Sequence, residues 1–192
     1  MSEENFEKKA FTFIEGQNLD LIPETSEWAH LYAKWLNDPE VRKFARGVLP
    51  LRVQYIKKRF EPNEQQGTPN FVVMNIWHKR DKKPIGIIGL GEINWFNRWA
   101  NAFIEIGEKD YWGKGIASEA TELLLQYAFE ELNLNKVAGK VIIDNVGSWK
   151  VAEKVGFRFE GILEKESYMD GEYLDVKRYV FLKDDWFSRK AK

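Results

Sequence analysis

A glycine-rich segment, Tyr111-Trp112-Gly113-Lys114-Gly115-Ile116-Ala117-Ser118, follows a strand-like run and precedes a strongly helical one. Glycines at such a place let successive backbone N–H groups converge without obstruction by Cβ atoms. The start of the helix adds partial positive charge. Together these features form a cradle for an oxyanion or a pyrophosphate, so the segment indicates a cofactor that carries phosphate.

Two other nucleotide-binding motifs can be compared with this segment by their spacing. A P-loop has the pattern G-x-x-x-x-G-K-S/T, whereas Gly107 and Gly113 are one residue further apart and no Ser or Thr follows Lys114. A dinucleotide fingerprint would place its third glycine at Ser118 and use Asp144 for the ribose, but an antiparallel meander precedes the segment instead of a βαβ unit. The dinucleotide interpretation stays open, as does a plain turn at the start of a helix.

The composition excludes or disfavours several other classes of function. The 192 residues have a net charge of -1, no cysteine and two histidines, His30 and His78. The balanced charge disfavours direct nucleic-acid binding, and the lack of cysteine excludes disulfides, thiolate zinc sites and cysteine nucleophiles. No apolar run approaches the ~20 residues of a membrane span, so we expect a cytoplasmic protein. Because the chain has no cysteine and two histidines, we also expect that it uses no metal.

The elements that position the segment follow from hydrophobic periodicity. The expected strands are Phe11–Ile14, Leu19–Ile22, Phe71–His78, Pro84–Trp95, Ala100–Gly107, Lys136–Ile143, Phe157–Tyr168 and Tyr173–Leu182. The expected helices are Glu27–Leu36, Val53–Phe60, Ser118–Leu132 and Ser148–Lys154. This order predicts an α/β (α+β) fold, a mixed and mostly antiparallel sheet of about six to seven strands with helices on both faces.

The domain organisation is expected to be simple. Residues 1–9 read as a disordered N-terminus and residues 188–192 as a basic tail, which leaves a single domain over residues 10–187. Trp28, Tyr32 and Trp35 form an aromatic stripe on the first helix, and such a stripe is more often core than ligand pocket.

The glycine-rich segment, the helix after it and the run Asn145–Phe157 resemble the GCN5-related N-acetyltransferase (GNAT) superfamily, and within it the RimJ/RimL type. The resemblance extends from Trp35-Leu36-Asn37-Asp38 to the C-terminal hairpin. The family pattern Q/R-x-x-G-x-G/A falls on Trp112–Ala117, with Trp112 in place of Gln or Arg. The resemblance implies a GNAT fold whose sheet splays between its fourth and fifth strands.

The resemblance also implies that acetyl-CoA is the acetyl donor. Its pyrophosphate would lie on the backbone of Trp112, Gly113, Lys114, Gly115, Ile116 and Ala117, and its pantetheine arm would pair with Glu105, Ile106 and Gly107. Asn145 matches a residue that hydrogen-bonds this arm, and Lys154 matches a residue beside the cofactor. Asn145 is also well suited to cap a helix, and both roles can hold together.

Two catalytic residues that are usual in the family are absent from this chain. Ala152 stands where many members have a tyrosine acid, and Asn101 stands where some have a glutamate base. Asn101 cannot accept a proton, but it can orient a water molecule that does. In the RimJ/RimL type a serine at a helix start donates a proton to the departing thiolate; Ser148 occupies that position, where its hydroxyl could also act only as a cap.

Acidic residues offer further candidates for a base. Glu105 interrupts an apolar strand beside the expected thioester and is the best local candidate, although a strand carboxylate more often faces solvent. Glu92 on the preceding strand and Glu166 beside Tyr168 are less favoured. Backbone N–H groups near Ile106 could stabilise the oxyanion.

The missing tyrosine and glutamate carry a hint about the acceptor. A protein α-amine has a pKa of about 8 and a lysine amine one of about 10.4, so an α-amine needs less help to lose its proton. We therefore expect a protein N-terminal α-amine as the acceptor, as for a ribosomal-protein-alanine N-acetyltransferase. A polyamine, amino sugar or aminoglycoside acceptor, and a non-catalytic acyl-CoA-binding module, remain alternatives, and an exposed strand makes a homodimer reasonable.

Overall fold

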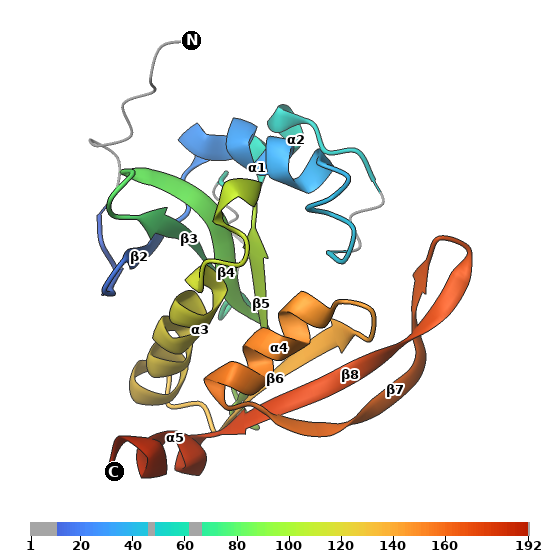
Figure 1. The fold of residues 1–192 in the computed structure, drawn as a ribbon. Coiled ribbons are helices and arrows are strands. Elements are labelled where there is room, and N and C mark those ends of the chain that lie inside the picture. Colours follow the sequence, from blue (N-terminus) through green and yellow to red (C-terminus); the bar gives the residue numbers. More distant parts are fainter. Residues whose placement is uncertain (1–10, 46–48, 62–66, 192) are drawn as a thin grey trace. The chain divides into compact units, whose positions relative to one another are not determined.

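The computed structural model describes residues 11–45, 49–61 and 67–191 (Figure 1). The sheet has eight strands, in the order β1-β2-β3-β4-β5-β6-β8-β7. This is more than the expected six to seven, because even a strand of two residues near the start of the chain pairs with its neighbour. The strands are β1 (Ile14–Glu15), β2 (Leu19–Pro23), β3 (Val72–His78), β4 (Lys83–Asn94), β5 (Trp99–Ile106), β6 (Lys136–Ile142), β7 (Arg158–Met169) and β8 (Glu172–Leu182). The helices are α1 (Ala29–Asn37), α2 (Val53–Lys58), α3 (Ile116–Gln126), α4 (Val146–Val155) and α5 (Lys183–Lys190).

Contacts between Cα atoms divide the chain into two compact units. The first contains Met1–Thr68, Val73–Ile88 and Ile104–Leu123, and the second contains Pro69–Val72, Gly89–Phe103 and Leu124–Lys192. The single domain over residues 10–187 stays a prediction, and residues 1–9, predicted to be disordered, lie outside the described residues. No helix among the described residues is long and apolar enough to cross a membrane.

The first unit has its core between α1 and strands β2 to β4. The predicted aromatic stripe is part of this core, since Trp28, Tyr32 and Trp35 are each at most 2% exposed. They pack with Ile22 and Trp77, and the rings of Trp28 and Trp77 stack with their centroids 5.9 Å apart. Thr25 caps the short 3-10 turn before α1, where its hydroxyl accepts a hydrogen bond from the Glu27 backbone N–H.

The opposite face of these strands is buried as well. Successive side chains of a strand point to opposite faces, so Leu21 and Ile76 face away from the α1 cluster. Both side chains are fully buried. The expectation that both faces of the sheet are covered is therefore confirmed for these strands.

The second unit contains the parallel pair of the sheet. β5 and β6 pair only from Trp99 with Lys136 to Asn101 with Ala138, while β6 remains paired with β8 as far as Ile142. The backbone of β5 beyond Asn101 therefore has no register with β6, which agrees with the expected splay of these two strands.

Strands β7 and β8 form a long hairpin around Asp170 and Gly171, whose φ angles of 52° and 91° suit a two-residue turn (Figure 1). The predicted long helix is α3 followed by a π-helical segment, Tyr127–Glu131. Gly156 ends α4 with a φ of 106°, as expected for a helix-terminating glycine.

The C-terminal end of the chain differs from the prediction of a basic tail. Ser188 to Lys190 form the last turn of α5. This helix is held by Trp186, which is 3% exposed and packs against Phe129 and Phe181. Arg189 donates a hydrogen bond of 2.9 Å to the Val155 carbonyl. The helix has little hydrophobic periodicity, so only these long-range contacts identify it.

Candidate active site

The glycine-rich loop has the backbone geometry of an anion cradle. Gly113 and Gly115 have φ angles of 71° and 81°, and α3 begins directly after them at Ile116. A Cβ atom at either glycine would meet no heavy atom within 4 Å, so glycine is required there by conformation and not by space. The first N–H groups of α3 have no acceptor within the helix. An open surface with free backbone donors fits the pyrophosphate of acetyl-CoA.

Trp112 links the loop to the end of β5. Its indole Nε1 donates a hydrogen bond of 2.8 Å to the Ile106 carbonyl, and its side chain remains 44% exposed. The residue that replaces the family's Gln or Arg thus contacts the backbone of the strand predicted to pair with the pantetheine arm.

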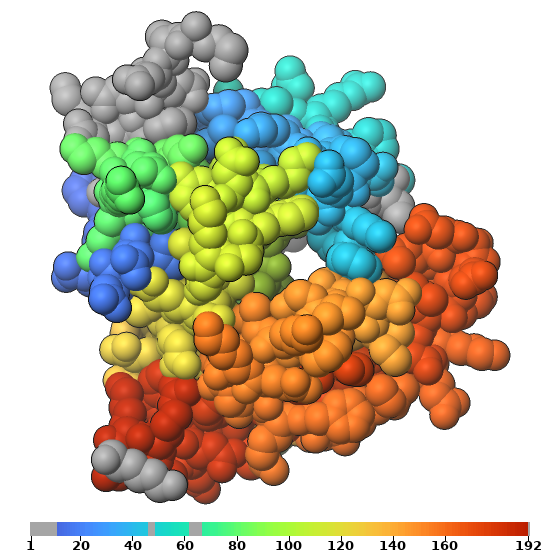
Figure 2. Space-filling view, viewed as in Figure 1, coloured from blue at the N-terminus to red at the C-terminus, as the bar shows by residue number. Residues whose placement is uncertain are grey.

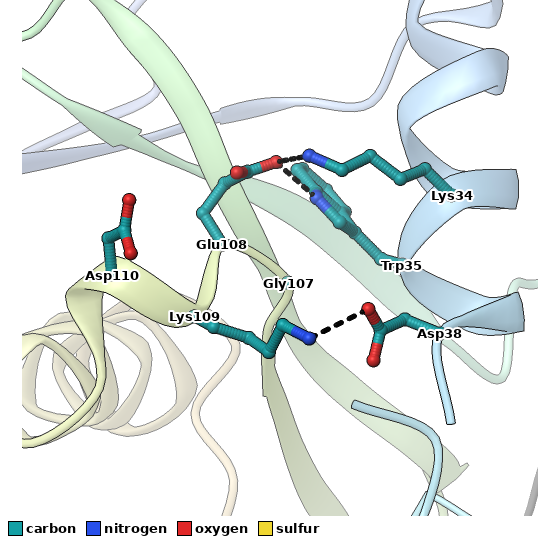
Figure 3. A pocket seen from close by; sticks show the side chains of 7 residues that line it. All are labelled: Lys34, Trp35, Asp38, Gly107, Glu108, Lys109 and Asp110. Atoms are coloured by element: carbon teal, nitrogen blue, oxygen red, sulfur yellow. Dashed lines mark hydrogen bonds and ion pairs between the residues drawn. The ribbon is translucent and has the colours of Figure 1, made fainter. Parts of the chain in front are cut away.

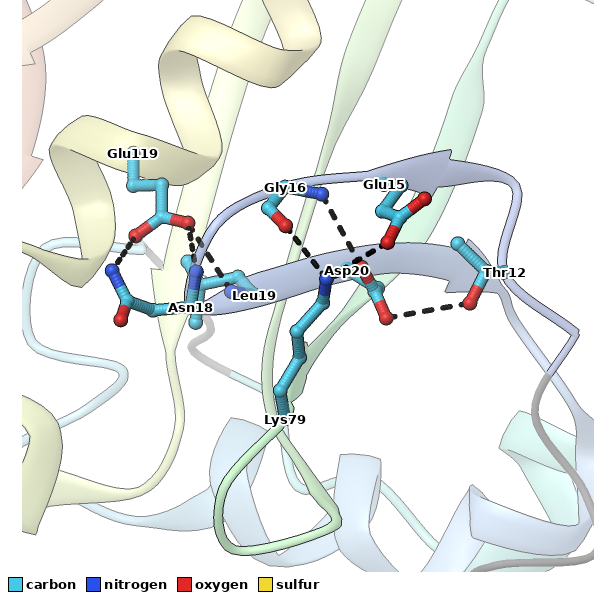
Figure 4. A network of polar contacts seen from close by, with 8 residues as sticks. All are labelled: Thr12, Glu15, Gly16, Asn18, Leu19, Asp20, Lys79 and Glu119. Carbon is cyan, nitrogen blue, oxygen red and sulfur yellow. Dashed lines mark hydrogen bonds and ion pairs between the residues drawn. The ribbon is translucent and has the colours of Figure 1, made fainter.

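The first turn of α3 is fixed by the turn between β1 and β2 (Figure 4). The Glu119 carboxylate accepts hydrogen bonds from the backbone N–H groups of Asn18 and Leu19, at 2.7 and 3.2 Å, and from the Asn18 side chain at 3.0 Å. On the other side, Lys79 donates to the Gly16 carbonyl at 2.6 Å and pairs with Asp20 at 3.1 Å. This network gives the loop and its helix a rigid support within the first unit.

A small cavity lies beside the end of β5 (Figure 3). Its volume is about 190 Å³, and its lining consists of Lys34, Trp35, Asp38, Gly107, Glu108, Lys109 and Asp110. A Cβ atom on Gly107 would lie 2.1 Å from Cγ of Trp35, so only glycine allows α1 to approach this closely.

Four of the five charged groups that line the cavity are paired, and the fifth is Asp110. Glu108 accepts hydrogen bonds of 2.7 Å from both Nε1 of Trp35 and Nζ of Lys34, and Lys109 pairs with Asp38 at 3.1 Å. No sequence pattern predicts this cavity, because its two sides are far apart in the chain: Trp35 and Glu108 are separated by 73 residues.

Glu105 is the strongest candidate for a base. Its Oε1 atom is buried and has no hydrogen-bond partner among the described residues. Burial raises the pKa of this carboxyl to about 7. The alternative of a solvent-facing strand carboxylate is therefore wrong, since packing removes most of the side chain from water. A carboxylate that ionises near neutral pH can accept a proton from an amine.

Asn101 lies in the second unit and contacts another of the acidic candidates. Its side-chain amide donates a hydrogen bond to the carboxylate of Glu92. Glu92 has a φ of 52° within β4, a conformation that is uncommon for a residue other than glycine. Glu166 is exposed and pairs with Lys140 at 3.3 Å, so it acts as a surface ion pair.

Helix α4 starts two residues earlier than predicted. Asn145 is its N-cap, and the Asn145 side-chain oxygen accepts a hydrogen bond of 3.3 Å from the Ser148 backbone N–H. The capping role of Asn145 is therefore confirmed. Ser148 lies inside the first turn and is not the capping residue, which leaves its hydroxyl available for another role. Lys154 is exposed near the end of the same helix.

The predicted site residues thus fall into two groups. The base candidate and the predicted cofactor segments belong to the first unit: Glu105, Ile106, Gly107 and Trp112–Ala117. Asn101, Asn145, Ser148 and Lys154 belong to the second unit. Their roles toward cofactor and acceptor remain predictions.

Residues 19–158 match the family model of the acetyltransferase (GNAT) domain. The chain belongs to the GNAT acetyltransferase family. Members of this family are N-acetyltransferases that use acetyl-CoA, so the dinucleotide interpretation of the loop is wrong, and the chain is an enzyme instead of a binding module.

Proteins similar to this GNAT acetyltransferase are named for different activities. One relative is the "Putative ribosomal N-acetyltransferase YdaF" of Bacillus subtilis (strain 168), to which the chain is 39% identical over 108 residues. The match covers 55% of this chain and 57% of that protein. It is 32% identical over 175 residues to the spermidine N(1)-acetyltransferase of Escherichia coli (strain K12), covering 91% of this chain and 86% of that protein. A crystal structure of spermidine N-acetyltransferase from Vibrio cholerae with CoA and spermine matches with a TM-score of 0.79 and 25% identity over 88% of this chain and 98% of that chain.

Proposed function

We propose that this GNAT acetyltransferase transfers the acetyl group of acetyl-CoA to the α-amine of a peptide or protein N-terminus, with Glu105 as the base. The observation that carries the proposal is the buried Oε1 atom of the half-buried Glu105, which has no hydrogen-bond partner among the described residues, together with a pKa of about 7. The similarity to a ribosomal N-acetyltransferase supports the same acceptor class.

The pKa of Glu105 suits an α-amine better than a polyamine. Moving a proton from an α-ammonium group, with a pKa of about 8, to a carboxylate with a pKa of about 7 is unfavourable by about tenfold. The same transfer from an alkyl ammonium group with a pKa of about 10.4 is unfavourable by more than about a thousandfold. Glu105 can therefore maintain a useful fraction of neutral amine only for the weaker base.

The proposed reaction balances with groups that the chain supplies. Acetyl-CoA provides the acetyl group as an activated thioester. Glu105 accepts the proton that the acceptor ammonium must lose before its nitrogen can form the C–N bond. As the C–S bond breaks, Ser148 is the proposed donor of the proton that the thiolate takes up. The Ser148 hydroxyl regains a proton from the nitrogen of the tetrahedral intermediate as the amide forms, and Glu105 returns the ammonium proton to solvent.

A polyamine is the second candidate, because the chain also resembles spermidine acetyltransferases and three carboxylates line the cavity beside Gly107. Asp38 and Glu108 are each paired with a lysine, however. The cavity wall therefore has little net negative charge with which to attract a polycation, and the first candidate is favoured.

The acceptor class is tested by competition between matched amines. Purified protein is given acetyl-CoA with a lysine-free peptide that has a free N-terminal alanine, the same peptide with a blocked N-terminus and one internal lysine, or spermidine. We expect kcat/KM to be highest for the free α-amine. Faster acetylation of spermidine or of the lysine side chain would overturn the proposal.

The role of Glu105 is tested by Glu105→Gln, which keeps the size of the side chain and removes its basicity. General-base catalysis contributes about 10²- to 10⁴-fold, so we expect kcat/KM to fall by that range. The wild-type profile of kcat/KM should also rise with pH through an apparent pKa of about 7, and this limb should disappear in the variant. Glu166→Gln removes an exposed, ion-paired carboxylate and serves as the control. An unchanged rate and pH profile in Glu105→Gln would exclude this base.

A further inference from the structure

Helix α5 contacts the C-terminal end of α4. Nη1 of Arg189 in α5 donates a hydrogen bond of 2.9 Å to the carbonyl of Val155, the last residue of α4. The last carbonyls of a helix have no partner within it, and its C-terminus attracts a cation. In the space-filling view the surface of α5 (dark red) adjoins that of α4 (orange) (Figure 2). Arg189 therefore supplies both a donor and a positive charge to this end of α4.

The guanidinium group of Arg189 is held by two aromatic rings. Its Cζ atom lies 4.7 Å from the centroid of the Trp186 ring and 5.5 Å from that of the Phe181 ring, both within the range of a cation–π contact. Trp186 is buried, and its Nε1 donates a hydrogen bond of 2.8 Å to Glu130 in the π-helical segment after α3. The side chain that reaches α4 is therefore fixed by the packed core of the second unit.

A second polar contact lies near the same end of α4. The hydroxyl of Tyr179 in β8 donates a hydrogen bond of 2.8 Å to the Glu153 carboxylate, and the Tyr179 side chain is buried. Of the ten residues of α4, all of which the structure describes, only Val155 is buried. A helix with so little buried surface depends on its few polar contacts for its orientation.

The orientation of α4 matters because its start carries Ser148, the proposed proton donor. A helix of ten residues is about 15 Å long, so a tilt of about 4° at one end moves the other end by about 1 Å. A displacement of about 1 Å at a reacting group can lower a rate by about a hundredfold. Contacts at the C-terminal end of α4 can therefore control chemistry at its start.

We propose that Arg189 and Tyr179 are positioning residues for acetyl transfer: they hold the C-terminal end of α4 and thereby place the Ser148 hydroxyl at its start. The inference rests on the proposed role of Ser148 as the proton donor to the thiolate. The match to the GNAT family model ends at residue 158, so it describes neither Tyr179 nor Arg189.

The role of Arg189 is tested by the rate of acetyl transfer in single turnovers, at saturating acetyl-CoA and with whichever acceptor amine reacts fastest. Arg189→Met removes the charge and the donor, and we expect the rate to fall about three- to tenfold. Arg189→Lys keeps a cation and should restore most of the rate. Lys190→Met removes the neighbouring cation of α5, which pairs with Glu130 and not with α4, and should change the rate by less than about twofold. A rate of Arg189→Met equal to that of Lys190→Met would overturn the proposal.

A double-mutant cycle with Ser148→Ala tests how Arg189 acts. We expect Ser148→Ala to lower the rate by at least about tenfold. If Arg189 acts through Ser148, Arg189→Met causes less than about a twofold further loss in the Ser148→Ala background. The same factor of loss in both backgrounds would show that Arg189 does not act through Ser148.

Tyr179→Phe provides a second variant, which removes one oxygen atom and leaves α5 unchanged. It should also slow the reaction only when Ser148 is present, and it keeps the test available if Arg189→Met does not fold. All rates are compared at a temperature where circular dichroism shows each variant to be folded. Lower thermal stability with wild-type rates in both Arg189→Met and Tyr179→Phe would overturn the positioning role.

The Ser148→Ala variant separates this inference from the proposed function. A wild-type rate in Ser148→Ala would overturn the proton donor and the positioning role together, whereas the base is tested independently by Glu105→Gln. A slow Ser148→Ala variant with no effect of Arg189→Met would overturn the positioning role alone.

Discussion

The conformation of single residues decides the shape of the glycine-rich loop. Gly115 has a φ of 81° with open space around it. An alanine at this φ costs about 1–2 kcal/mol, so Gly115→Ala is expected to move the loop away from its binding conformation. We predict that CoA binding weakens by about 5- to 30-fold, measured by calorimetry.

A matched substitution controls for the added methyl group. Gly161 in β7 also has no heavy atom within 4 Å of a Cβ position, but its φ is not positive. Gly161→Ala should therefore leave CoA affinity unchanged. If Gly115→Ala binds CoA as tightly as Gly161→Ala does, the positive φ is not required for the cradle.

At the scale of elements, helix α4 depends on one capping residue. Asn145→Ala removes the side-chain acceptor of the Ser148 N–H, which also donates to the Asn145 carbonyl at 3.1 Å, and is expected to lower the free energy of unfolding by about 1 kcal/mol. Asn145→Asp keeps an acceptor oxygen and should retain the stability, because a negative charge is favourable at a helix N-terminus. Urea denaturation measures both effects.

The same pair of variants separates the cap from the predicted cofactor contact of Asn145. If the amide N–H₂ also binds the cofactor arm, Asn145→Asp loses CoA affinity without losing stability. If CoA binds both proteins equally, Asn145 serves only the helix.

For the whole molecule, the buried Glu105 couples stability to pH. Its pKa is raised from about 4.5 in the unfolded chain to about 7 in the folded protein, so between these values the folded state binds more protons than the unfolded state. Stability therefore decreases as pH rises through this window, by up to about 3 kcal/mol from this group. Below pH 4.5 the carboxyl is protonated in both states and has no such effect.

Glu105→Gln has no carboxyl to ionise and provides the reference. We predict that its unfolding free energy relative to wild type increases from pH 4.5 to pH 7 and is constant above that range. Denaturant titrations at several pH values test this. A difference that does not change with pH would show that Glu105 titrates as an exposed carboxyl.

The elements of this protein were predictable because their signals are local. The aromatic stripe of α1 depends on near neighbours in the chain, and its predicted place in the core is confirmed. The cap at Thr25 and the left-handed glycine Gly156 depend on near neighbours as well. The glycine-rich loop before α3 is likewise readable from consecutive residues. Helix α5 was not predicted, since packing around Trp186 defines it more than its own sequence does.

The sequence alone therefore determined the family, the order of the strands and of the first four helices, and the loop that suits a phosphate-bearing cofactor. Tertiary structure decided which side chains meet and which lose water. Glu119 contacts Asn18 across 101 residues, and Glu108 contacts Trp35 across 73. The raised pKa of Glu105 was also decided by tertiary structure, because it comes from desolvation, and desolvation depends on packing by segments that are distant in the chain. No local sequence pattern predicts it.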